Sequence, residues 1–75
     1  MKQYNIYGGI DYPKYLYTGL YSKKEDAKID AWIATSHIAN SYPRIRGSLS
    51  YWVIPTAEDT IEDLILGYII DGSIS

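Results

Sequence analysis

The sequence predicts an α+β domain in which a three-stranded antiparallel sheet carries two helices on one face, in the order ββαβα. Three observations support this prediction. Residues 14–21 alternate with period two, residues 23–40 place apolar side chains at helical spacing, and residues 49–54 concentrate aromatic and β-branched residues. The chain has 75 residues, which is enough for one domain, so residues 1–75 are expected to form a single unit.

The first two strands are expected to form a hairpin. Residues 2–7 read as a strand, and Gly8-Gly9 followed by residues 11–13 (Asp-Tyr-Pro) supply turn chemistry. Residues 14–21, "KYLYTGLY", then form the second strand. The loop between the two strands is longer than a two-residue turn, so a longer-loop hairpin is predicted.

A helix and a third strand are expected next. Ser22 and Glu25 have the spacing of a capping box, in which each side chain bonds to the backbone of the other residue. The helix should cover residues 23–40, because Pro43 biases the residue before it away from helical geometry. Residues 44–48, "RIRGS", read as a loop, and residues 49–54, "LSYWVI", as the third strand.

The C-terminal part predicts a second helix that begins at Thr56 as N-cap and ends at Gly72. Glu58 and Asp59 would lie near the positive end of the helix dipole. Residues 64–70, "LILGYII", are also rich in β-forming side chains. A fourth strand there, after a short helical turn, is the alternative.

The aromatic composition is unusual, with nine tyrosines, two tryptophans and no phenylalanine. Strict alternation along residues 14–21 would place Tyr15, Tyr17 and Tyr21 on one sheet face, turned away from the helices. Trp52 of the third strand is a candidate neighbour. Tyrosine presents a large rigid area with a hydroxyl that water can solvate, so this face is predicted to bind a partner. Cross-strand packing alone is the alternative explanation.

The predicted helices carry more apolar surface than one sheet face needs. Ala27, Ala31 and neighbouring small residues form one stripe of the first helix, while Trp32 and Ile33 lie on another side. In the second helix the far side carries Leu66 and Ile70. The predicted oligomer interface is therefore Trp32, Ile33, Leu66 and Ile70, in a homo-oligomer and most simply a dimer. Packing of the two helices against each other is the alternative.

Charge is divided unevenly along the chain, whose net charge is −2. Residues 1–46 hold seven basic and four acidic residues (7 − 4 = +3), and residues 47–75 hold five acidic residues and no basic one (−5). Arg44 and Arg46 lie close in sequence to Tyr42, Tyr51 and Trp52, a combination that could bind a nucleotide or nucleic acid. The acidic composition argues against nucleic acid, and the two arginines are equally suited to anchor a protein partner.

Several classes of function lack the residues they need. The sequence has no cysteine and one histidine, and it contains no nucleophile elbow or phosphate-binding glycine loop. His37 lies seven residues beyond Asp30, about 10 Å along a helix, too far for one ion to join them. We therefore expect no catalytic site, metal or cofactor. No apolar run approaches membrane-spanning length, and the N-terminal residues lack a signal-peptide pattern, so a cytoplasmic location is expected.

Residues 17–34, "YTGLYSKKEDAKIDAWIA", resemble a pattern found in short phage and mobile-element proteins, where a strand ends in serine and a Glu-Asp-Ala helix follows. The resemblance implies a phage-encoded inhibitor of a host or defence protein, and it transfers no functional residue. The function predicted from the sequence is a small non-catalytic protein-binding module that occludes such a protein. Its partner-binding residues would be Tyr15, Tyr17, Tyr21, Trp52, Arg44 and Arg46. The alternatives are a nucleotide or nucleic-acid binder that uses Arg44 and Arg46, and a self-assembling structural subunit.

Overall fold

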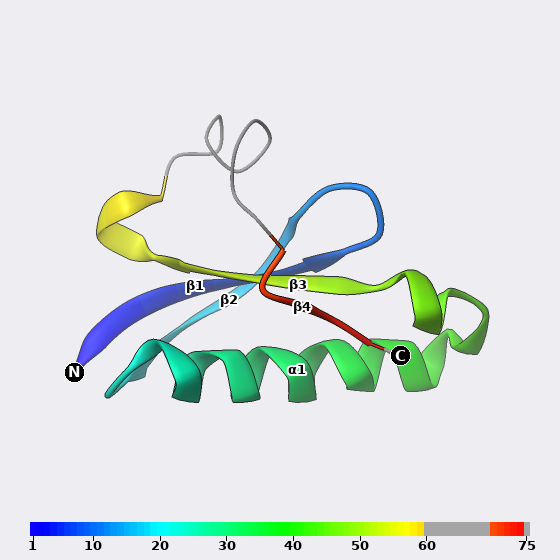
Figure 1. The fold of residues 1–75 in the computed structure, drawn as a ribbon, viewed down its shortest axis with the longest axis horizontal. Coiled ribbons are helices and arrows are strands. Elements are labelled where there is room, and N and C mark those ends of the chain that lie inside the picture. The colour runs from blue at the N-terminus through cyan, green and yellow to red at the C-terminus, as the bar shows by residue number, and fades with distance from the viewer. Residues whose placement is uncertain (60–69, 75) are drawn as a thin grey trace.

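The computed structural model describes residues 1–59 and 70–74 and has an α+β fold, as the sequence predicts (Figure 1). The expected ββαβα order is matched only in part. In the described residues the chain forms four strands, one α-helix and two 3-10 turns. They are β1 (Lys2–Gly9), β2 (Lys14–Tyr21), α1 (Lys24–Ser41), η1 (Pro43–Ser48), β3 (Ser50–Pro55), η2 (Thr56–Glu58) and β4 (Gly72–Ser73).

The sheet is antiparallel throughout, with strand order β2-β1-β3-β4. β1 lies in the middle, because it pairs with β2 in the hairpin and with β3 after the chain returns through α1. α1 runs across one face of this sheet (Figure 1). The pairing of β1 with both neighbours makes its side chains the centre of the core.

A β-bulge in β2 changes which tyrosines share a face. Ile6 is paired with Tyr17, but the next residue, Tyr7, is paired with Tyr15, so Leu16 is an extra residue on β2. As a result Tyr15 lies on the face away from α1, whereas Tyr17 and Tyr21 lie on the face that α1 covers. The expectation that the three rings share one exposed face is wrong, because a single inserted residue reverses the alternation.

α1 packs on the sheet through small side chains. Its buried residues, Ala27, Ala31, Thr35 and Ala39, are spaced four apart and therefore follow one side of the helix. The close approach is possible because β1 carries Gly8 there, where an added Cβ would lie 3.4 Å from Thr35 Oγ1. The predicted capping box is wrong, because the helix begins at Lys24 after an N-cap residue that makes no side-chain hydrogen bond.

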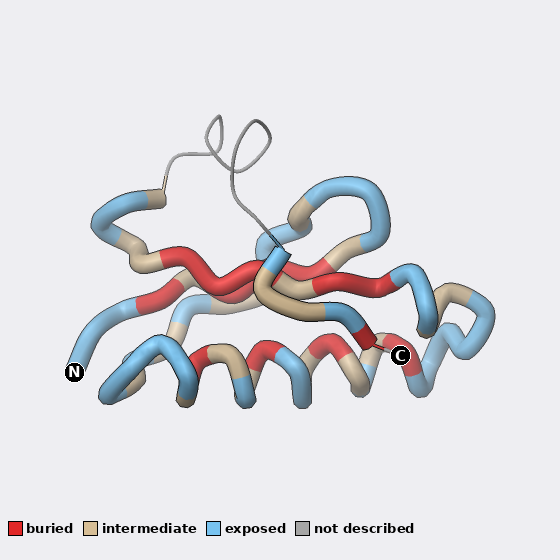
Figure 2. Tube along the Cα trace, viewed as in Figure 1, coloured by how far each residue is buried: buried red, intermediate tan, exposed pale blue. Residues whose placement is uncertain are grey.

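Buried residues lie along the strands and on one side of α1 (Figure 2), and they form clusters on both faces of the sheet. Between the sheet and α1, Ile6 and Val53 are fully buried, and each contributes on the order of 1.5–3 kcal/mol. On the opposite face Tyr7, Trp52 and Ile54 form a second buried cluster. Trp52 is only 4% exposed, so the expectation of an exposed Trp52 on a bare sheet face is wrong.

The C-terminal prediction is corrected at both of its ends. Thr56 begins a 3-10 turn rather than a capped α-helix, and Gly72 belongs to β4, which pairs with β3, instead of ending a helix. The buried side chain of Ile74, which packs with Ala39 and Leu49, holds this short strand in place. Whether residues 64–69 are helix or strand lies outside the described residues.

Candidate functional site

Two of the tyrosines that the sequence assigned to partner binding are tied to α1 instead. The hydroxyl of Tyr17 donates to Asp30 Oδ2 at 2.8 Å, and the hydroxyl of Tyr21 donates to the same oxygen. Burial raises the pKa of both tyrosines, and hydrogen bonding to the Asp30 carboxylate raises it further. Their polar atoms therefore serve an internal contact between β2 and α1, which phenylalanine could not make.

A third tyrosine also donates a hydrogen bond to a carboxylate, on the other face of the sheet. Tyr7 donates to Asp59 Oδ2, and Asn5 Nδ2 donates to the same atom at 2.5 Å. Burial is the main cause that raises the pKa of Tyr7, followed by its bond to Asp59. The abundance of tyrosine over phenylalanine is thus explained in part by carboxylates placed beside rings that are buried or half-buried.

Among residues 1–59 and 70–74 the exposed tyrosine rings are Tyr12 and Tyr42, each 62% exposed, and Tyr15, 57% exposed. Tyr15 is partly engaged within the fold, because its hydroxyl lies 2.7 Å from Thr18 Oγ1 and its ring meets Tyr7 edge to face at 5.7 Å. Tyr12 and Tyr42 each precede a proline, which restricts the backbone of the residue before it. The backbone conformations of these two tyrosines are therefore restricted.

Tyr12 and Tyr42 line the same groove, which we call the end groove. It has a volume of about 440 Å³, and its lining residues come mainly from the β1–β2 loop and its flanking strands, the C-terminal end of α1 and η1. The β1–β2 loop, the end of α1 and η1 lie toward the same end of the molecule (Figure 1). Most of its lining is aliphatic or glycine backbone. The lining residues are Gly8, Gly9, Ile10, Asp11, Tyr12, Lys14, Leu16, Ile38, Tyr42, Ile45 and Leu49.

Two charged residues line the end groove, and two arginines are sequence neighbours of a residue that lines it. Lys14 and Asp11 line it, and Arg44 and Arg46 flank Ile45, which also lines it. Arg44 is exposed, while Arg46 donates from Nη1 to Asn40 Oδ1 at 3.2 Å. This bond brings Arg46 close to the last turn of α1, where positive charge is favourable.

The structure brings together only part of the predicted partner-binding set. Arg44 and Arg46 flank the groove residue Ile45 in η1, Tyr15 lies on the sheet face away from α1, and Tyr17, Tyr21 and Trp52 are engaged within the fold. The sequence reasoning missed Tyr12 and Tyr42 as a pair. The signal was present, since both occur in a Tyr-Pro dipeptide within a turn.

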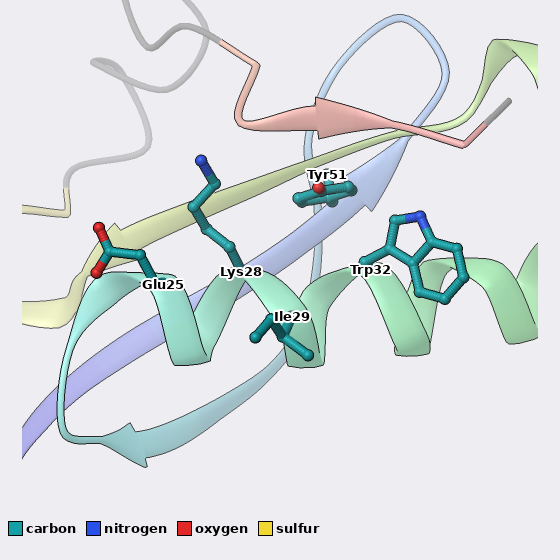
Figure 3. A pocket seen from close by; sticks show the side chains of 5 residues that line it. All are labelled: Glu25, Lys28, Ile29, Trp32 and Tyr51. Carbon is teal, nitrogen blue, oxygen red and sulfur yellow. The ribbon is translucent and has the colours of Figure 1, made fainter.

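The predicted oligomer interface is exposed where the structure describes it. Trp32, Ile33 and Ile70 are each more than 40% exposed, and Leu66 lies outside the described residues. Trp32 also borders a second groove of about 370 Å³, between α1 and Tyr51 of β3 (Figure 3).

Neither the described side chains nor the comparisons point to a particular chemistry. In residues 1–59 and 70–74, no three histidine, aspartate or glutamate side chains gather closely enough to hold a metal ion. No helix in this part of the chain has the length and apolar character needed to cross a bilayer. No family model, curated protein or solved structure matches the chain.

Proposed function

We propose that the protein is a small non-catalytic protein-binding module whose partner inserts an apolar side chain into the end groove. The observation that carries this proposal is the convergence of two exposed rings, Tyr12 and Tyr42, on an aliphatic groove of about 440 Å³. Binding surfaces are enriched in tyrosine because the ring offers a large contact area and loses little conformational entropy.

The surroundings of the groove suit a protein partner. Leu16, Ile38 and Ile45 offer an apolar floor for an anchor residue, and Lys14 and Asp11 offer one cation and one anion at the rim for polar groups of the partner. Arg44, which is exposed and precedes the groove residue Ile45, would mainly increase the association rate with an acidic partner. Inhibition by occlusion of a host or defence protein is the form of this function that the sequence favours.

The test compares two variants in capture of the partner from a host lysate. The double variant Tyr12→Ala/Tyr42→Ala removes both groove rings, whereas Tyr15→Ala removes a ring of similar exposure on the far face of the sheet. We expect the double variant to weaken capture at least tenfold, because each lost anchor costs about 1–2 kcal/mol, and Tyr15→Ala to retain it. The proposal would be overturned if Tyr15→Ala lost capture while the double variant Tyr12→Ala/Tyr42→Ala retained it. Circular dichroism checks that both variants are folded.

A nucleotide or nucleic-acid ligand is the second candidate, favoured by the presence of Lys14, Arg44 and Arg46 at the same end as the two exposed rings. The stacking role expected for Trp52 is not retained, because that ring is buried. A salt titration separates the candidates. A steep linear fall of log affinity with log salt would favour phosphate contacts, and a shallow one a protein partner.

A further inference from the structure

The hydrogen-bonding direction of each strand in the sheet can be worked out from one contact beside β4. Val53, whose side chain packs in the core beneath α1, donates its backbone N–H to Asp71 Oδ2 at 2.7 Å, on the β4 side of β3. Because backbone groups alternate in direction along a strand, the next residue, Trp52, directs its own groups toward β1. Trp52 is paired with Tyr7, so Tyr7 and Trp52 form a hydrogen-bonded pair between β1 and β3.

The same alternation passes through β1 and determines which way β2 points. Ile6 precedes Tyr7 in β1, so its backbone groups are directed toward β2, where it is paired with Tyr17. Tyr17 and, two residues later, Gly19 therefore bond to β1. Thr18 and Leu20 direct their backbone N–H and C=O groups the other way, toward the outer edge of β2.

This outer edge is free in the part of the chain that the structure describes, because β2 is the last strand of the sheet on its side. Two features protect the beginning of β2 against another strand, the charge of Lys14 and the β-bulge at Leu16. The stretch from Tyr17 to Tyr21, which we call the β2 edge, contains no charged residue and no proline. Its Leu20 is 62% exposed. An edge with unpaired backbone groups is complementary to an extended chain.

The β2 edge is also complementary to itself. Its two outward-directed residues, Thr18 and Leu20, lie one residue to either side of Gly19. A twofold axis that passes through the sheet beside Gly19 therefore places Thr18 of one copy opposite Leu20 of the other, and the reverse. Each of these two pairs can exchange both of its main-chain hydrogen bonds. No like charges meet within the paired stretch, and the exposed Leu20 side chains of both copies lie on the same sheet face.

We propose that the β2 edge pairs antiparallel with the β2 edge of a second copy of this chain, so that the two sheets join into one. The stretch supplies both halves of a matched, uncharged pairing and needs no other sequence. This inference goes beyond the proposed function, because none of residues 17–21 is among those that line the end groove.

Amide hydrogen exchange of the wild-type protein, followed by NMR at increasing protein concentration, tests the pairing directly. The amides of Tyr17 and Gly19 bond to β1 and should be protected at every concentration. The amides of Thr18 and Leu20 should exchange about tenfold more slowly once most of the protein is dimeric. Exchange of these two amides at one rate at all concentrations would overturn the proposal. Slowing only after host-lysate protein is added would assign the edge to another chain and would also overturn it.

A proline substitution gives an independent test by sedimentation equilibrium. Leu20→Pro deletes an N–H that points away from β1, so the bonds between β1 and β2 remain while pairing with a second copy is blocked. Leu20→Thr is the matched control, because it removes the apolar side chain and keeps the N–H. We expect Leu20→Pro to weaken the dimer at least tenfold and Leu20→Thr by a smaller factor. Circular dichroism checks that both variants are folded. Equal weakening by the two variants, or a wild-type protein that stays monomeric at all concentrations, would refute the inference.

Discussion

The bonds from Tyr17 and Tyr21 to Asp30 allow a sharp prediction about stability. Tyr17→Phe deletes one hydroxyl that donates to the Asp30 carboxylate at 2.8 Å and leaves the ring in place. A hydrogen bond to a charged group contributes about 1.5–3 kcal/mol. Because Asp30 is only half-buried and water can replace part of the lost bond, we expect a cost of about 1–2 kcal/mol. For a domain of this size that lowers Tm by roughly 4–16 °C.

A double-mutant cycle separates the hydrogen bond from other effects of the substitution. In the Asp30→Ala background the Tyr17 hydroxyl has lost its carboxylate acceptor and keeps the longer bond to the backbone oxygen of residue 30, at 3.3 Å, so Tyr17→Phe should cost less there than in the wild type. Tyr17→Phe/Tyr21→Phe should cost more than either single change, because the carboxylate then loses both donors. Urea denaturation followed by circular dichroism measures each free energy of unfolding.

The matched control for this experiment is Tyr15→Phe, whose hydroxyl is hydrogen-bonded to the Thr18 hydroxyl at an exposed position. We expect it to change stability by less than about 0.5 kcal/mol. The reasoning is refuted if Tyr17→Phe costs the same with and without Asp30, or if Tyr15→Phe is the more destabilising change. Replacement of Tyr17 and Tyr21 by alanine would thus impair folding, so loss of partner capture by such variants would not identify a binding surface.

Three further predictions follow from single contacts. Gly19→Ala should destabilise the protein by about as much as Tyr21→Phe, because an added Cβ would lie 2.5 Å from the Tyr21 hydroxyl and would displace this hydroxyl. Similar Tm values for the wild type and Gly19→Ala would contradict this prediction. The contribution of Tyr17 to the free energy of unfolding should not change with pH below about pH 10, the pKa of an unfolded tyrosine. Above that pH the free energy of unfolding should fall by at most about 1.4 kcal/mol per pH unit, because the raised pKa keeps Tyr17 protonated in the folded state while the unfolded state ionises. Urea titrations at alkaline pH should show a shallower fall for Tyr17→Phe. Asp71→Ala should cost about 1–3 kcal/mol of stability, because Asp71 Oδ2 accepts a hydrogen bond from a β3 backbone amide at 2.7 Å. Lys24→Ala removes the ion pair to Asp71 Oδ1 at 3.2 Å and should cost less than about 1 kcal/mol. Equal costs for the two variants would show that the ion pair dominates.

The local elements were accessible from sequence because they depend on short-range patterns. The β1–β2 hairpin, α1 and β3 lie within one or two residues of their expected bounds, since alternation, helical spacing and proline positions act over a few residues. The exposure of Trp32 and Ile33 was also accessible, because the small residues of α1 identify the side that packs on the sheet.

The site depended on tertiary structure. No local sequence pattern predicts the β-bulge at Leu16 of β2. This bulge nevertheless decides which tyrosines of β2 lie on the sheet face that α1 covers and which lie on the opposite face. Likewise, Asp30 and Asp59 become acceptors for tyrosine hydroxyls only after α1 and the chain beyond β3 reach the sheet. These long-range contacts decide whether a tyrosine hydroxyl is solvated or makes a hydrogen bond within the fold.

By itself the sequence therefore determined the class of fold, its main elements and a surplus of ring and aliphatic surface. The tertiary structure decided which rings remain outside, placing Tyr12 and Tyr42 at the end groove and Trp32 on the exposed side of α1. The physical reason is that strand periodicity fixes a side chain's face only relative to its neighbours. The strand register and the partner across the sheet fix that face relative to the core.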